Sequence, residues 1–195
     1  MQYRIKLNDV NPSNIWFTSD WHLFHNNILK YDGRPFKNID DMNDTIIKNH
    51  SPPNLGPKDH LFILGDLSFR DRDNLNELLH RITAKKYFVV GNHDKPVWKQ
   101  KFMDRHFSRY FAGYAELTVK QQMAVLSHYP FFTWNRSHKG SWHLFGHTHG
   151  QDASNPRLKT HQTMNVGVML NDYKPFNWND IADRFKDRKA TDDHN

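Results

Sequence analysis

The chain contains no cysteine among its 195 residues. Disulfide bonds and thiolate metal sites are therefore excluded, and any metal ion must be held by nitrogen and oxygen ligands. The N-terminal stretch MQYRIKLNDV lacks the apolar core of a secretory signal. No stretch approaches the roughly 18 consecutive apolar residues of a membrane-spanning helix. These absences predict a cytoplasmic protein with no membrane partner.

Charge and length set broad limits on function. Lys and Arg number 27 against 21 Asp and Glu, which gives a net charge of +6. This excess favours anionic partners such as phosphates, nucleic acid or acidic surfaces, without choosing among them. No repeat or linker divides the chain, so we expect a single domain over residues 1–185, followed by a flexible C-terminal tail at 186–195. The 14 Phe and six Trp are expected mainly to fill the core, and the alternative is stacking on bases.

Three short apolar runs in the first half are expected to form buried strands. They are NIWFTSD, HLFILGD and KYFVVGNHD, which end at residues 20, 66 and 94. Strands that stop at polar clusters are typical of sheets whose C-terminal edge carries a site. Helices are expected over NIDDMNDTIIKNH, over DRDNLNELLHRI and near residues 96–106, because apolar residues recur there at helical spacing. The first half therefore predicts an α/β layer with a largely parallel sheet.

The second half has a different pattern. YFAGYAELTV, QMAVLSHYPF, SWHLFGHTH and TMNVGVML are strand-like, with little helix between them. This pattern predicts hairpins or a second sheet. A last helix is expected over FNWNDIADRF.

Carboxylate, amide or imidazole groups follow the apolar runs and are candidate metal ligands: Asp20, His22, Asp66, Asn92, His128, His147 and His149. Imidazole and carboxylate ligands without thiolate suit Mn, Fe, Zn or Ni. Seven ligands are too many for one ion. Two ions about 3.5–4 Å apart that share one carboxylate would use them all, and such a pair suits in-line displacement at phosphorus.

Backbone geometry decides how these side chains converge. On an extended strand, Asp20 and His22 would face the same side. His147 and His149 would do the same, or would divide between two ions if the chain turns after Gly146. A glycine lies shortly before a candidate ligand in three places, which indicates tight turns or close backbone approach at Gly65, Gly91 and Gly146.

The ordered motifs DWH, GDLSF, GNHD, SHYP and GHTH resemble the calcineurin-like metallophosphoesterase superfamily, whose pattern is DxH, GDxx, GNHD/E, H and GHxH. The resemblance extends from about residue 14 to residue 168. The run YDGRPF at residues 31–36 further resembles a compact bacterial and phage-type subgroup. The resemblance implies a four-layer α/β/β/α sandwich of two mixed sheets flanked by helices.

The resemblance also implies roles for individual residues. The first metal would be held by Asp20, His22, Asp66 and His149, and the second by Asp66, Asn92, His128 and His147. His93 would contact the scissile phosphate or protonate the leaving oxygen, and Asp94 would orient the His93 ring. We expect Mn²⁺ to be favoured, with Fe, Zn or Ni as alternatives. Contacts to the substrate are expected from Arg34, Asn26 and Arg136.

The expected function is hydrolysis of phosphodiesters or phosphomonoesters by attack of a metal-bridging hydroxide. The candidate substrates include nucleotides and nucleic acid. Two alternatives stay open at this point. One is a metal-dependent nuclease, which the lack of an obvious second domain for gripping a duplex disfavours. The other is a nucleic-acid-binding module with a vestigial metal site, which the intact motifs disfavour.

Overall fold

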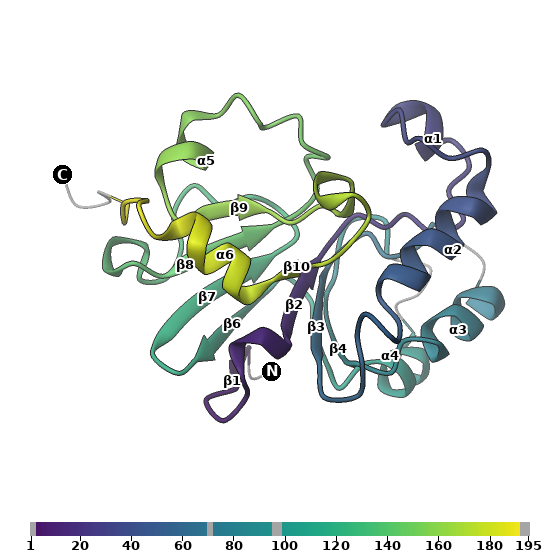
Figure 1. Cartoon of the computed structure of the whole chain (residues 1–195), viewed down its shortest axis with the longest axis horizontal. Coiled ribbons are helices and arrows are strands. Elements are labelled where there is room, and N and C mark those ends of the chain that lie inside the picture. Colours follow the sequence, from purple (N-terminus) through teal and green to yellow (C-terminus); the bar gives the residue numbers. More distant parts are fainter. Residues whose placement is uncertain (1–2, 70–71, 95–98, 192–195) are drawn as a thin grey trace.

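Two five-stranded sheets pack face to face (Figure 1) in the computed structural model, which describes residues 3–69, 72–94 and 99–191. The first sheet has the order β10-β2-β3-β4-β5, in which all pairs are parallel except β10 with β2. Its strands are β2 (Ile15–Thr18), β3 (His60–Leu64), β4 (Lys85–Val89), β5 (Arg109–Phe111) and β10 (Phe176–Asn177). The predicted parallel sheet is confirmed.

The second sheet has the order β1-β6-β7-β8-β9. β6 and β7 form an antiparallel hairpin, and β7, β8 and β9 run parallel to one another. The strands are β1 (Arg4–Lys6), β6 (Tyr114–Val119), β7 (Gln122–Ser127), β8 (Trp142–Phe145) and β9 (Thr163–Asn165). The predicted second sheet with a hairpin is therefore present.

Helices flank both sheets and complete the predicted α/β/β/α sandwich (Figure 1). The first sheet is covered on its outer side by α2 (Ile39–Asn49), α3 (Arg72–His80) and α4 (Gln100–His106). The apolar stripe of α2 points inward because Met42, Ile46 and Ile47 recur at helical spacing, and all three are buried. The Asn38 side chain caps this helix by accepting a hydrogen bond from Asp41 N.

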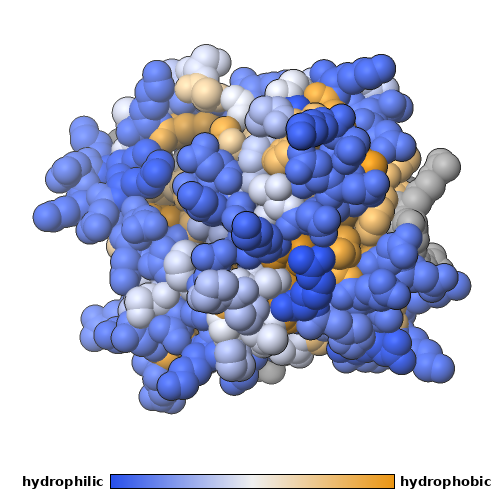
Figure 2. Space-filling model, turned by 45° about the vertical axis from the view of Figure 1, so that its right-hand side comes forward, coloured by the Kyte–Doolittle hydropathy of each residue, from blue (hydrophilic) through white to orange (hydrophobic). Residues whose placement is uncertain are grey.

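The remaining helical segments are short. α5 (Pro156–Thr160) lies beside β9, and α6 (Trp178–Phe185) packs Trp178, Ile181 and Phe185 into the core between the sheets. The others are α1 (Ile28–Tyr31), η1 (Pro12–Asn14), η2 (Ser137–Lys139) and η3 (Val168–Asn171). Within the described ranges, no helix is long and apolar enough to cross a membrane. The face shown in Figure 2 is mostly hydrophilic, with apolar residues in small separate areas.

Two predicted strands differ from the structure. The run at residues 110–119 belongs to β5 and β6, which lie in different sheets and are separated by a bend at Ala112 and Gly113. The run TMNVGVML is a strand only over Thr163–Asn165 and continues as the 3-10 helix η3. Apolar alternation cannot show where a chain leaves one sheet for another.

The segment that follows α6 is hydrogen-bonded to the rest of the chain where the structure describes it. Arg188 Nη1 donates to the carbonyl oxygens of Leu158 and Thr163 at 2.6 and 3.0 Å. Thr191 is buried. These hydrogen bonds connect Arg188 to α5 and β9, and the flexibility of residues 186–195 stays a prediction. Residues 192–195 lie outside the described residues.

Candidate metal centre

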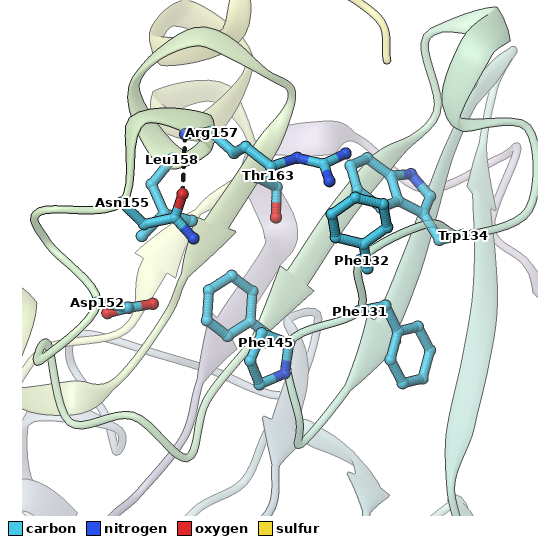
Figure 3. Close-up of a pocket in the computed structure, with 10 residues that line it drawn as sticks. Phe131, Phe132, Trp134, Phe145, Asp152, Asn155, Arg157, Leu158 and Thr163 are labelled. Atoms are coloured by element: carbon cyan, nitrogen blue, oxygen red, sulfur yellow. Dashed lines mark hydrogen bonds between the residues drawn. The ribbon is translucent and has the colours of Figure 1, made fainter. Parts of the chain in front are cut away.

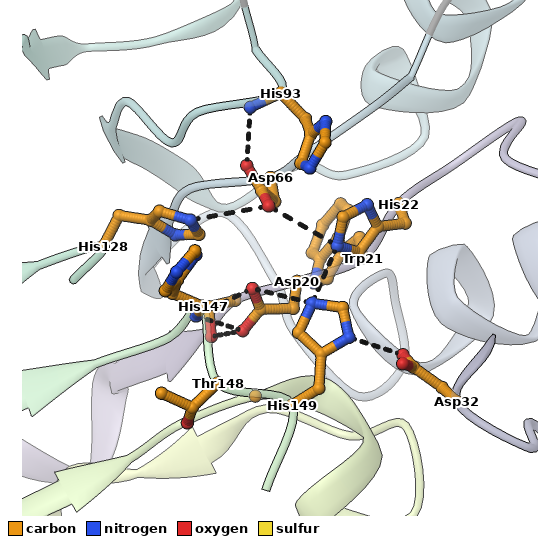
Figure 4. A network of polar contacts seen from close by, with 12 residues as sticks. Asp20, Trp21, His22, Asp32, Asp66, His93, His128, His147, Thr148 and His149 are labelled. Atoms are coloured by element: carbon orange, nitrogen blue, oxygen red, sulfur yellow. Dashed lines mark hydrogen bonds and ion pairs between the residues drawn. The ribbon is translucent and has the colours of Figure 1, made fainter. Parts of the chain in front are cut away.

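The predicted ligands meet at one rim of the sandwich, beyond the C-terminal ends of the parallel strands (Figure 4). Backbone hydrogen bonds join the strand ends within each sheet, from Asp20 N to Gly65 O and from Gly146 N to His128 O. The two sheets are connected by His147 N, which donates to Asp20 Oδ1 at 2.9 Å. Residues far apart in sequence are thereby held in one cluster.

The first group of donors comprises Asp20, His22, Asp66 and His149, each with one ligand atom within 4.8 Å of the others. The Nε2 atoms of His22 and His149 lie 3.0 Å apart. His22 Nε2 is 3.5 Å from Asp66 Oδ2, and His149 Nε2 is 3.7 Å from Asp20 Oδ1. These nitrogen and oxygen atoms face a common point, which fits a borderline divalent ion.

The second group comprises Asp66, His128 and His147, again within 4.8 Å. Asn92 Oδ1 adjoins it, 2.9 Å from His128 Nε2 and 3.1 Å from His147 Nδ1. Asp66 Oδ2 is 3.4 Å from His128 Nε2. Asp66 thus belongs to both groups, and the turn after Gly146 divides His147 and His149 between them. This donor set fits two ions that share one carboxylate.

Five of these donors have a left-handed backbone, although none is glycine. The φ angles are 57°, 51°, 53°, 72° and 49° at Asp20, His22, Asp66, His147 and His149. Each such residue costs about 1 kcal/mol or more, and strain of this kind gathers at functional sites. The expected extended geometry for Asp20 and His22 is therefore wrong: β2 ends at Thr18, and sharp turns direct both side chains to the first group.

Two glycines allow the backbone to approach the carboxylates, as the sequence predicted. A Cβ at Gly91 would overlap Asp66 Oδ1, and a Cβ at Gly146 would lie 2.7 Å from Asp20 Oδ2. Any larger residue would displace a carboxylate from the cluster.

For two of the donors, Asp66 and His22, electrostatics favour the protonation states that a metal site needs. Burial acts to raise the pKa of Asp66, but hydrogen bonding and the charges of His128 and His22 outweigh it and lower the pKa to about 2. Burial lowers the pKa of His22 to about 3. At neutral pH Asp66 is therefore ionised and His22 is neutral, as coordination requires.

His93 and Asp94 have different surroundings. His93 is exposed at the rim, with its ring centroid 5.5 Å from that of His22, and its backbone N donates to Asp66 Oδ1 at 3.0 Å (Figure 4). Asp94 is fully buried. Its carboxylate accepts hydrogen bonds from the backbone N atoms of Asp66, Leu67 and Gly91 at 2.7–2.8 Å.

Asp94 therefore holds the loop backbone instead of orienting the His93 ring, which corrects the predicted role. Burial, together with the charge of Asp66, raises the pKa of Asp94 to about 6 against the effect of the backbone hydrogen bonds.

Arg34 does not reach outward to a substrate. Arg34 is only 4% exposed. Its guanidinium donates to Asp20 O, Trp21 O and Asp32 Oδ2 at 2.8–3.1 Å. The prediction of a phosphate-binding Arg34 is wrong, because these internal acceptors use the guanidinium to fix the turn that carries Asp20.

Asp32 is a site residue that the sequence reasoning missed. Its Oδ2 lies 2.7 Å from His149 Nδ1. A carboxylate behind a ligating imidazole fixes the tautomer and the ring orientation. The sequence feature that could have identified Asp32 is the YDGRPF run, in which it stands two residues before Arg34.

The other two expected substrate contacts have different outcomes. Arg136 is exposed and lines a shallow pocket with Gln122 and Ser141, at the N-terminal ends of β7 and β8. The cluster lies beyond their C-terminal ends, so a contact from Arg136 is contradicted. Asn26 lies on an exposed turn four residues after His22, and its contact with substrate stays a prediction.

The fold and the Asp/His cluster together define a metallophosphoesterase. Residues 13–135 match the family model of calcineurin-like phosphoesterases, and the chain belongs to this family.

The relatives include an uncharacterized protein of Methanocaldococcus jannaschii, 33% identical over 168 residues that cover 83% of this chain and 85% of that one. The Gene 66 protein of Mycobacterium phage D29 is 28% identical, with 74% of this chain and 85% of that one covered. A protein of unknown function from Aquifex aeolicus has a similar fold, with a TM-score of 0.67 and 23% identity over 87% of this chain and 97% of that chain.

Proposed function

We propose that this protein hydrolyses phosphate esters with two divalent ions, of which Mn²⁺ is favoured. The observation that carries the proposal is the left-handed backbone at five donors of two groups that share Asp66. Strain at so many adjoining positions persists only where the surrounding structure enforces it. This favours a working site over a nucleic-acid-binding module with a vestigial one.

In this proposal, Asp20, His22, Asp66 and His149 would hold one ion, and Asp66, Asn92, His128 and His147 would hold the other. Divalent ions supply a positive charge that attracts the phosphate and a field that makes water more acidic. Asp20 and Asp66 counter part of that charge, and the remainder favours an anionic ester.

The protein's own side chains supply the rest of the chemistry. The exposed His93 ring beside His22 would donate a proton to the leaving oxygen or hold a phosphate oxygen. Its backbone N–H fixes Asp66. Asp94 holds the N–H groups of Asp66 and Gly91 so that the loops after β3 and β4 keep their geometry.

The direct test is an assay of the full chain with bis(4-nitrophenyl) phosphate and 4-nitrophenyl phosphate. We expect hydrolysis of at least one ester in the presence of Mn²⁺ and its loss on chelation. Salt-sensitive binding of nucleic acid that survives chelation would instead support the binding module. A metal-loaded protein inactive on both esters and on single-stranded DNA and RNA would overturn the proposal.

Asp32 offers a prediction specific to the first group. In Asp32→Ala, we expect Mn²⁺ to bind about 10- to 100-fold more weakly at the first site and nearly unchanged at the second. His149 loses its carboxylate partner, and Arg34, which also loses one, holds the turn of Asp20 in the same group. Calorimetric titration with Mn²⁺ measures this. Asp9→Ala, at an exposed position, is the control. Equal weakening of both sites would count against the assignment.

A further inference from the structure

A pocket of about 240 Å³ lies between the segments at residues 130–134 and 152–158 (Figure 3). Phe145 forms its floor at the end of β8, two residues before His147. Pro130 begins one wall, two residues after His128. The pocket is therefore built from the same loops that carry candidate metal ligands.

Side-chain contacts link the pocket to the cluster. The ring of Tyr129 packs on that of His147 with centroids 4.4 Å apart. Asn165 Nδ2 donates to Thr148 Oγ1 at 2.7 Å and to Asp152 Oδ1 at 3.4 Å. Thr148 stands between the two histidines of the GHTH motif, so Asp152 is tied to the segment that supplies both.

Aromatic rings dominate one side of the pocket (Figure 3). Phe132 is 78% exposed, and the guanidinium carbon of Arg157 lies 4.1 Å from its ring centroid. Phe131, which precedes Phe132 in the same wall of the pocket, stacks on His143 with an interplanar angle of 10°. An exposed ring held in place beside a cation is a surface on which a flat, electron-rich ring stacks.

Asp152 gives the pocket a carboxylate oxygen that needs a hydrogen-bond donor. Its Oδ2 is buried and has no hydrogen-bond partner among the described residues. A buried carboxylate oxygen without a donor is costly, and such groups call for an explanation. A small rotation of the Asp152 side chain would bring this oxygen to the pocket, where an N–H group of a bound molecule would supply the missing donor and an acyl chain would leave it unpaired.

We propose that this pocket binds the amino-bearing nucleobase of a nucleotide ester whose phosphate lies at the metal cluster. The base would stack on Phe132, and its exocyclic amino group would donate to Asp152 Oδ2. This inference rests on the proposed function and names the substrate class for the same site. Phe131 and Phe132 are exposed at this pocket and so depart from the expected role of filling the core.

The test compares two diesters with the same leaving group, the 4-nitrophenyl ester of adenosine 5′-phosphate and methyl 4-nitrophenyl phosphate. With Mn²⁺, the wild type should have a higher kcat/KM for the adenosine ester. Phe132→Ala should raise KM for that ester about tenfold and leave the methyl ester within about twofold. Tyr3→Ala, another partly exposed aromatic residue, is the matched control.

Asp152→Asn tests the hydrogen bond separately. The amide offers a donor as well as an acceptor, so the variant should shift its preference from the adenosine ester toward the inosine ester, which has an oxygen in place of the amino group. A merely structural role would lower hydrolysis of all three esters equally.

A binding measurement separates this inference from the proposed function. Adenosine, which has no phosphate, should bind the chelator-treated protein in calorimetry, and Phe132→Ala should weaken that binding about tenfold. If no ester is hydrolysed but adenosine binds in this way, the proposed function fails and the pocket assignment stands. If the esters are hydrolysed without preference for the base and adenosine does not bind, the pocket assignment is overturned.

Discussion

Replacing Asp66 with alanine is expected to remove strong binding of both divalent ions and to lower kcat by at least about 1,000-fold. Its Oδ2 lies within 3.5 Å of both His22 Nε2 and His128 Nε2, and Asp66 belongs to both donor groups. Loss of the ions removes several kcal/mol of charge stabilisation in the transition state, and each 1.36 kcal/mol is about a factor of ten. Nitrophenyl ester kinetics and metal analysis of the purified variant measure the effect.

Two comparisons make the Asp66 result specific. Asp9→Ala should keep the metal content and the activity of the wild type. Urea unfolding of the metal-free Asp66→Ala protein shows whether the fold is intact. An intact variant that keeps full occupancy of either ion would contradict a shared carboxylate.

Asp94→Ala is expected to destabilise the metal-free protein by about 3 kcal/mol or more. Its carboxylate is the acceptor for three backbone N–H groups, those of Asp66, Leu67 and Gly91. Each buried donor left without an acceptor costs about 1–3 kcal/mol. The midpoint of urea unfolding measures the loss.

The asparagine variant is the matched control for Asp94. An amide oxygen in the place of Oδ2 would still accept from Asp66 N and Gly91 N, so Asp94→Asn should lose less stability than Asp94→Ala. If Asp94 instead served to orient His93, both variants would alter the pH profile of kcat and leave the unfolding midpoint unchanged.

The sequence allowed the location of the cluster to be predicted because parallel strands end at one edge. Asp20, Asp66 and Asn92 follow three apolar runs that became β2, β3 and β4. Once the runs are taken as parallel strands, their polar C-terminal residues must share a rim. The order of the five motifs then gave the family and the two-sheet sandwich.

The local geometry of the ligands could not be predicted in the same way. The backbone turns left-handed at Asp20 and His22. Asp and His are enriched at positive φ among non-glycine residues, but most of them occupy other regions, so the residue types alone do not locate the turn. Tertiary hydrogen bonds such as Asp20 N to Gly65 O and His22 N to Asp66 O impose the turn.

The hydrogen-bond partners of charged residues likewise could not be predicted from the sequence. A loop arginine is usually on the surface, yet Arg34 is buried because the carbonyl groups of Asp20 and Trp21 face it. Asp94 stands beside His93 in the sequence, but its carboxylate turns to the backbone of another loop. Such pairings depend on contacts that only the folded chain brings together.

A dinuclear centre that shares Asp66 can be observed by electron paramagnetic resonance of the full chain titrated with Mn²⁺, combined with metal analysis. We expect two Mn²⁺ ions per chain with the spectrum of a spin-coupled pair. His149→Ala should weaken mainly the first site and His147→Ala mainly the second. Binding of a single ion, or of two ions without magnetic coupling, would contradict a dinuclear centre that shares Asp66.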